Sequence, residues 1–82
     1  MVIYDKAKQK LESVRTKVFV IKQSNLSDDL KILQIKELIN PIKEHYKETR
    51  QRIISTRLRK RYTLKYNKLI SDSERILKRL EG

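Results

Sequence analysis

Turn-forming residues are nearly absent from this chain, and their absence constrains the fold more than any other feature. The 82 residues include one glycine, at the last position, and one proline, Pro41. Tight hairpin turns depend on these two residue types, so the sequence argues against β-hairpins and for helices. There is no cysteine, so neither a disulfide nor a thiolate metal site can hold the chain together. We expect one small all-α domain spanning residues 1–82, with a core of barely sufficient size.

An apolar stripe with heptad spacing runs through the first quarter of the chain. Its members are Tyr4, Ala7, Leu11, Val14, Val18 and Ile21. A narrow stripe of this kind predicts a helix over about residues 4–23 that packs against one partner helix. The β-branched run at 18–21 could instead begin a strand, but the sequence offers no second strand to pair with it.

A second helix is predicted over about residues 28–39. Ser27 is a suitable N-cap, and the carboxylates of Asp28 and Asp29 suit the positive end of the helix dipole. Asn40 and Pro41 are expected to end this helix, because proline lacks the backbone donor that would continue it. The helix is apolar around more than half its circumference, so we expect it to be buried or covered by a second chain. The predicted protein interface comprises Leu30, Leu33, Leu38 and Ile42.

A long third helix is predicted from Pro41 to about residue 70. The capping-box pattern at residues 71–74 favours a short fourth helix over 72–80, and one continuous helix to Leu80 is the alternative. The apolar face changes phase near residues 53–54, which indicates a kink or two halves with different partners. We therefore expect a three-helix arrangement or a helical hairpin with a long, kinked third helix. Antiparallel packing of the first helix on the third, with the second capping them, is the simplest way to bury these stripes.

Positive charge is concentrated in the third predicted helix. The net charge is +11, and no Asp or Glu interrupts the segment from residue 49 to residue 71. On one ideal helix, a row of cations falls within about 20° of a single line, a spacing that suits the phosphates of a nucleic-acid backbone. This predicted stripe comprises Lys43, Arg50, Arg57, Arg61, Lys68, Arg75 and Arg79. The predicted nucleic-acid-binding residues are Lys43, Arg50, Arg57, Arg59, Lys60, Arg61, Lys65 and Lys68.

Two tyrosines lie within the basic segment. Tyr62 and Tyr66 are four residues apart and are predicted to stack on bases exposed in a single strand. The alternative for Tyr62 is a place in the core, because it continues an apolar stripe. No known base-reading motif is present, so we expect binding without sequence preference, and DNA as the nucleic acid.

The sequence gives little support for catalysis. His45 is the single histidine, so no transition-metal site is expected. Asp28 and Asp29 are adjacent and point in different directions on a helix, so they cannot flank one bond as acid and base. A glycine-rich phosphate loop is excluded because the chain has no internal glycine. We expect a non-enzymatic protein without catalytic residues, metals or cofactors.

Three functions compete on these observations. The leading hypothesis is a small basic accessory protein that binds nucleic-acid backbone through its third helix while its apolar faces engage a larger protein or a second copy. The alternative is a helical adaptor or homodimer whose basic face binds an acidic protein surface. A peripheral membrane role is less favoured, since the chain lacks Trp and its one Phe lies outside the basic segment.

The longest apolar run, residues 18–21, is too short to span a membrane. We therefore expect a cytoplasmic location, at the nucleoid if DNA is bound.

In size, charge and helical layout the chain resembles the small basic accessory subunits of crenarchaeal B-family replicative DNA polymerases. The resemblance rests on composition over the whole chain. It implies a non-catalytic subunit that binds the polymerase in DNA replication and adds phosphate contacts near the DNA.

Overall fold

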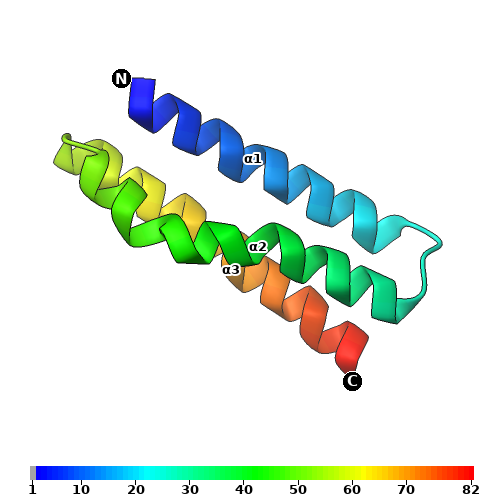
Figure 1. The fold of residues 1–82 in the computed structure, drawn as a ribbon. Helices are drawn as coiled ribbons and strands as arrows, with labels where there is room; N and C mark the ends of the chain where they lie inside the picture. The colour runs from blue at the N-terminus through cyan, green and yellow to red at the C-terminus, as the bar shows by residue number, and fades with distance from the viewer. Residues whose placement is uncertain (1) are drawn as a thin grey trace.

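Three helices, joined by two short turns, make up the protein (Figure 1). The computed structural model describes residues 2–82, and this range contains no strand. The helices are α1 (Val2–Gln23), α2 (Asp28–Arg52) and α3 (Thr56–Glu81). They form an elongated bundle of 42 × 19 × 16 Å. The predicted all-α, three-helix fold is confirmed.

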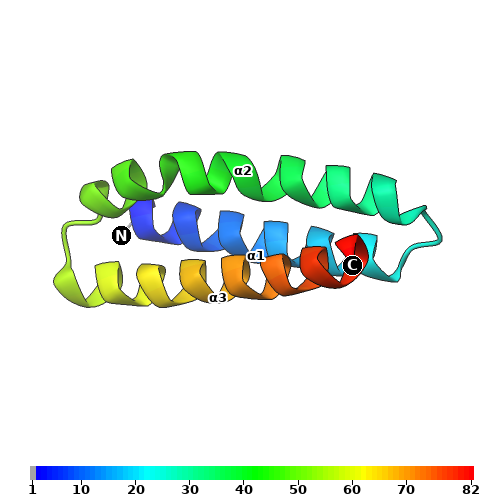
Figure 2. The same ribbon diagram turned by 90° about the horizontal axis from the view of Figure 1, so that it is seen from below.

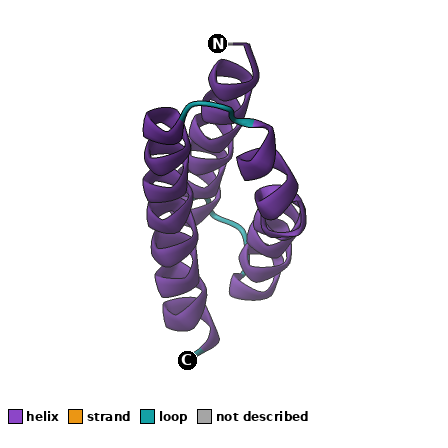
Figure 3. Cartoon of the chain, turned by 90° about the vertical axis from the view of Figure 1, so that its left-hand side faces the viewer, coloured by secondary structure: helices purple, strands orange, loops and turns teal. Residues whose placement is uncertain are grey.

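The chain direction alternates along the bundle. Short turns reverse it after α1 and again after α2, so α1 and α3 run in parallel and α2 is antiparallel to both (Figure 2). Figure 3 shows the two turns in teal. The prediction that α1 packs antiparallel on α3 is therefore wrong. It treated the second helix as a cap on a two-helix core, whereas each helix contacts both of the others.

The heptad stripe of α1 forms one wall of the core, as predicted. Leu11 and Val18 are each 3% exposed, and Ala7 and Ile21 pack against the same cluster. The complete buried apolar core comprises Tyr4, Leu11, Val14, Val18, Ile35, Ile39, Ile42, Ile53, Tyr62, Leu69, Ile70 and Leu77. It contains residues from every helix, so the bundle folds around a single core.

Pro41 does not end the second helix, contrary to prediction. It lies inside α2, which continues to Arg52 and is visibly bowed in Figure 2. Proline removes one hydrogen bond, to the carbonyl group of Glu37 four residues earlier. Both residues are exposed, so that carbonyl can turn toward water while Ile39 and Ile42 keep the inner side of α2 packed.

The predicted helix from Pro41 to residue 70 is divided by a turn at residues 53–55. Ile53 has an extended backbone (φ −80°, ψ 107°) and is 2% exposed, whereas Ile54 is 76% exposed. The Ser55 hydroxyl caps α3 by accepting a hydrogen bond from the backbone N–H of Leu58 (3.3 Å). The phase change near residues 53–54 thus marks a complete reversal of the chain and not a kink.

The predicted fourth helix over 72–80 is the last part of α3. The capping-box residues 71–74 lie within this helix, and Ser73 is buried in it. The inner stripe continues without a change of phase through Leu77 to Leu80, so ending the helix at residue 71 would expose packed side chains. Burial outweighs the local capping signal here.

Candidate nucleic-acid interface

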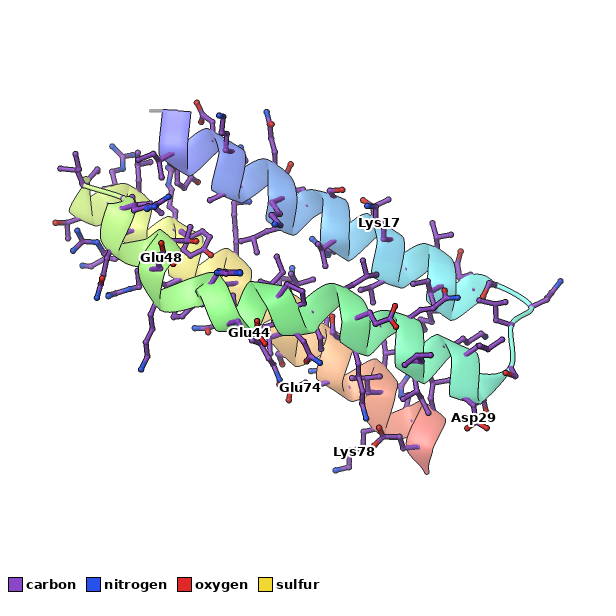
Figure 4. The ribbon with its side chains drawn as sticks, viewed as in Figure 1. Lys17, Asp29, Glu44, Glu48, Glu74 and Lys78 are labelled. Carbon is purple, nitrogen blue, oxygen red and sulfur yellow. The ribbon has the colours of Figure 1, made fainter. Side chains whose placement is uncertain are left out.

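The outer face of α3 carries charge of one sign. Helical periodicity places seven cations opposite the buried stripe of α3, and all seven are exposed. They are Arg57, Lys60, Arg61, Lys68, Arg75, Lys78 and Arg79. None of them forms an ion pair with another residue of the described range 2–82. Figure 4 shows Lys78 extending outward from α3. We call these seven residues the basic face.

The carboxylates of α3 lie beside the basic face and not on it. Glu74 Oε2 is 3.7 Å from Lys43 Nζ of α2, and Glu81 Oε1 is 3.2 Å from Lys36 Nζ. Asp72 is half-buried at the boundary between α1 and α3. The seven cations therefore form a surface that only one carboxylate of α3, Asp72, approaches, at the edge facing α1.

Two predicted phosphate-binding residues lie on another helix. Because the chain reverses at 53–55, Lys43 and Arg50 belong to α2, and the predicted single stripe from Lys43 to Arg79 does not exist. Arg50 is exposed, and its Nε donates a hydrogen bond to Thr63 Oγ1 of α3 (3.2 Å). Both cations lie beside the basic face and can add to its field, but they do not extend it along α3.

Arg59 and Lys65 are also predicted contacts, and the structure gives them other partners. Arg59 is half-buried, and its Nε and Nη2 donate to the Ile53 carbonyl oxygen (3.1 and 2.8 Å). This bidentate contact holds the turn between α2 and α3, so Arg59 has a structural role. Lys65 Nζ is 3.9 Å from Glu12 Oε1 of α1, an exposed pair of small energy that a phosphate can displace. The predicted residues Arg57, Lys60, Arg61 and Lys68 all belong to the basic face.

The two tyrosines predicted to stack on bases instead stack on Tyr46. The ring centroids of Tyr46 and Tyr66 are 3.9 Å apart, and those of Tyr46 and Tyr62 are 5.8 Å apart. Tyr62 is 3% exposed, so its ring is not accessible to a base, and Tyr66 is half-buried. Burial raises the pKa of both phenols, although a hydrogen bond with Thr49 opposes the shift at Tyr62. The core alternative for Tyr62 describes this position correctly.

The predicted protein interface divides into two pairs. Ile42 is buried and Leu38 packs against the core, so both are used within the bundle. Leu30 and Leu33 are 45% and 53% exposed on the outer side of α2. This second pair alone is accessible to a partner.

Neither a metal centre nor a membrane span is found in the described residues. His45 is exposed, and residues 2–82 contain no group of three metal-ligating side chains. Within the same range, every helix is too short or too polar to cross a membrane.

A hollow between α1 and α3 was not predicted from the sequence. It has a volume of about 190 Å³, and it borders the basic face. Its polar, charged and aromatic lining comprises Arg15, Phe19, Lys22, Asp72, Ser73, Arg75 and Arg79. The site depends on residues that are more than fifty positions apart, so only the parallel packing of α1 and α3 reveals it. One signal was available: Phe19, the single Phe of the chain, lies outside the heptad stripe.

Comparison of the chain with known protein families, with curated proteins and with solved structures gave no match.

Proposed function

We propose that this protein is a non-catalytic accessory protein that binds the backbone of nucleic acid, DNA in particular, through the basic face of α3. The single-sign charge of that face supports the proposal most strongly. Clustered cations repel one another and weaken the folded state, so this arrangement is a cost unless an anionic partner offsets it. Regularly spaced phosphates are such a partner.

The start of α3 supports the same proposal. Arg57 is the second residue of α3, where the positive end of the helix dipole disfavours a cation by about 0.3–1 kcal/mol. A carboxylate there would stabilise the helix, yet the first turn of α3 contains none. Cations at this position become favourable when a phosphate binds, because the phosphate interacts with both the side chains and the free N–H groups of the helix.

The test is fluorescence anisotropy with labelled single-stranded and double-stranded DNA at several salt concentrations. We expect submicromolar binding near about 0.15 M salt. For four to seven neutralised phosphates, the slope of log affinity against log salt should be about −4 to −6 with duplex DNA and about −3 to −5 with single strands. Unrelated sequences should bind about equally, because phosphate contacts carry no sequence information.

Charge reversal on α3 tests whether this helix is the binding surface. Changing Arg57, Arg61 and Lys68 to Glu should reduce affinity by at least about a hundredfold, because three phosphate contacts are replaced by repulsion. The salt slope for duplex DNA should also flatten by about 0.9 for each lost contact. A control variant changes exposed lysines elsewhere by the same total charge. Its substitutions are Lys6→Glu, Lys17→Glu and Lys47→Glu. Equal losses in the two variants would show that net charge alone attracts DNA, and the assignment to α3 would be wrong.

A protein partner is the second component of the proposal. Leu30 and Leu33 expose apolar surface on α2, away from the basic face, so a larger protein or a second copy could bind there while α3 holds DNA. Sedimentation velocity over a range of concentrations, with Leu30→Ser/Leu33→Ser as the comparison, tests self-association. If the wild-type protein fails to bind DNA at physiological salt, an acidic protein surface becomes the preferred partner of α3. A place at the nucleoid, and in a polymerase complex, depends on the DNA-binding result.

A further inference from the structure

The hollow between α1 and α3 continues the basic face around one side of α3. Arg75 and Arg79 belong to both, and α1 adds Arg15 and Lys22 from the opposite wall. Asp72 is the one carboxylate in the lining, so four cations outnumber it. A strand bound along the basic face would pass beside this hollow at Arg75 and Arg79.

Phe19 gives the hollow an accessible aromatic surface. Its side chain is 52% exposed, whereas Tyr4 and Tyr62 are buried and Tyr46 and Tyr66 are stacked on each other. Lys22 Nζ lies over the Phe19 ring, 5.5 Å from its centre, so a base that stacks on Phe19 would take the opposite face or displace this ammonium group. A base that stacks on this ring would bring its own phosphate close to the surrounding arginines.

Ser73 supplies an unused hydrogen-bonding group. Its side chain is 1% exposed, and its Oγ has no hydrogen-bond partner within the described residues 2–82. A serine inside a helix commonly bonds the carbonyl oxygen four residues earlier, but this hydroxyl does not. A buried polar group without a partner is rare, and Ser73 is one of the residues that line the hollow.

The size of the hollow restricts the ligand. At about 190 Å³ it is smaller than the roughly 300–1,000 Å³ of pockets that enclose a whole small molecule. Together with an open aromatic ring and a cationic rim, this volume suits part of one nucleotide that remains attached to a chain held elsewhere on the surface.

We propose that this hollow is a subsite for one nucleotide of a single strand. The base stacks on Phe19, its phosphate lies between Arg75 and Arg79, and Ser73 hydrogen-bonds the nucleotide. The inference rests on the proposed binding of nucleic acid by the basic face, and it adds a preference for single strands. Bases of a duplex are stacked and paired, so they cannot reach a side chain in this way.

The chain contains no Trp, which permits a direct test. Phe19→Trp places a unique fluorophore in the hollow, and stacking on a base should quench it. Leu33→Trp is the matched control, because Leu33 is 53% exposed on the outer side of α2, away from the basic face and the hollow. We expect oligothymidylate to quench the Trp at position 19 strongly and the one at 33 weakly, and duplex DNA to quench neither strongly.

Affinity measurements separate this inference from the proposed function. Phe19→Ala should weaken single-strand binding by about 5- to 150-fold, the range for loss of one base–aromatic stack, and leave duplex binding within about twofold. Ser73→Ala should also weaken single-strand binding while leaving the helical content, measured by circular dichroism, unchanged. Leu33→Ala is the control for Phe19→Ala, because Leu33 is equally exposed but lies on α2, away from the basic face.

Each other outcome has a definite meaning. If Phe19→Ala changes neither affinity while both remain steeply salt-dependent, the subsite is wrong and the proposed function stands. If the wild-type protein binds neither form of DNA, the proposed function fails and the subsite fails with it. If ATP alone quenches the Trp at position 19 and oligothymidylate does not, the hollow binds free nucleotides, and the single-strand assignment is overturned.

Discussion

The beginnings of α2 and α3 have the same backbone chemistry and opposite charge. Ser27 and Ser55 each cap their helix by accepting a 3.3 Å hydrogen bond from the N–H three residues later. The second residue is Asp29 in α2 and Arg57 in α3. The aspartate stabilises its helix through the dipole, whereas the arginine opposes it. Folding alone favours the first choice, so the second indicates a requirement other than folding.

The same contrast extends along both outer surfaces. The outer side of α2 alternates in sign: Glu44 and Glu48, shown in Figure 4, lie near Lys47 and Arg52, and Glu48 pairs with Arg52 at 3.3 Å. The basic face of α3 has no such alternation. Since both helices pack through similar inner stripes, the bundle can evidently fold with either kind of outer surface. We infer that inner stripes specify the fold and that the outer surface of α3 is specialised for a partner.

The largest expected effect separates the inner and outer sides of α2. Ile35 is 0% exposed, so Ile35→Ala should lower the free energy of unfolding by about 2–5 kcal/mol. Leu33, two residues away, is 53% exposed, and Leu33→Ala should change the free energy of unfolding by less than about 0.5 kcal/mol. Urea unfolding followed by circular dichroism measures both values. Similar losses in the two variants would mean that a second copy covers Leu33 in solution.

The next prediction separates two arginines of the first turns of α3. Arg59→Ala removes both hydrogen bonds to the Ile53 carbonyl and should cost about 1.5–3 kcal/mol of stability, with little effect on DNA affinity. Arg57→Ala should change stability by less than about 0.5 kcal/mol and reduce the salt slope of DNA binding by about 0.9. Urea unfolding and anisotropy on the same samples give both quantities. Should the two variants exchange these phenotypes, the division between structural and binding cations would be wrong.

Local patterns predicted the helices well and their connections poorly. The heptad stripe correctly predicted α1, and the Ser27 N-cap correctly predicted where α2 begins. Both signals depend only on residues that are close in the sequence. Pro41 misled the prediction, since the cost of proline inside a helix falls when its lost hydrogen bond faces water. The turn at 53–55 contains neither Gly nor Pro and is held by the Arg59 side chain, so turn composition could not locate it.

The basic face, which we propose as the binding surface, was partly predictable from the sequence for the same reason. Cations within α3, such as Arg57 and Lys68, share a face by local periodicity and were predicted together. Lys43 was placed with them only because the reversal after α2 was not recognised. The hollow containing Phe19 and Ser73 required knowledge of which helices are neighbours, and sequence periodicity does not give that.

A pH-dependent effect of intermediate size is expected from the inner side of α3. Burial raises the pKa of Tyr62 and Tyr66 above the ordinary value of 10.0, so the folded state favours the protonated phenols. Their contribution to stability is complete below about pH 10 and is lost as pH rises through the folded pKa values. Urea unfolding between about pH 8 and about pH 11 should show this decline. Tyr62→Phe should make this loss of stability at high pH smaller. If the loss is the same in the variant, deprotonation of lysines causes it instead.

The smallest effect tests the opening contrast directly. Arg57→Asp should stabilise the protein by about 0.3–1 kcal/mol, and Asp29→Arg should destabilise it by a similar amount, because both residues occupy the second position of a helix. Both changes should shrink as salt is added, since they are electrostatic. DNA affinity should fall for Arg57→Asp, whereas Asp29→Arg should not lower it. If Arg57→Asp instead destabilises the folded protein, Arg57 makes a contact needed for folding, and its charge would no longer indicate a binding partner. A gain in stability with a loss of affinity would mean that this arginine favours binding at the expense of the helix.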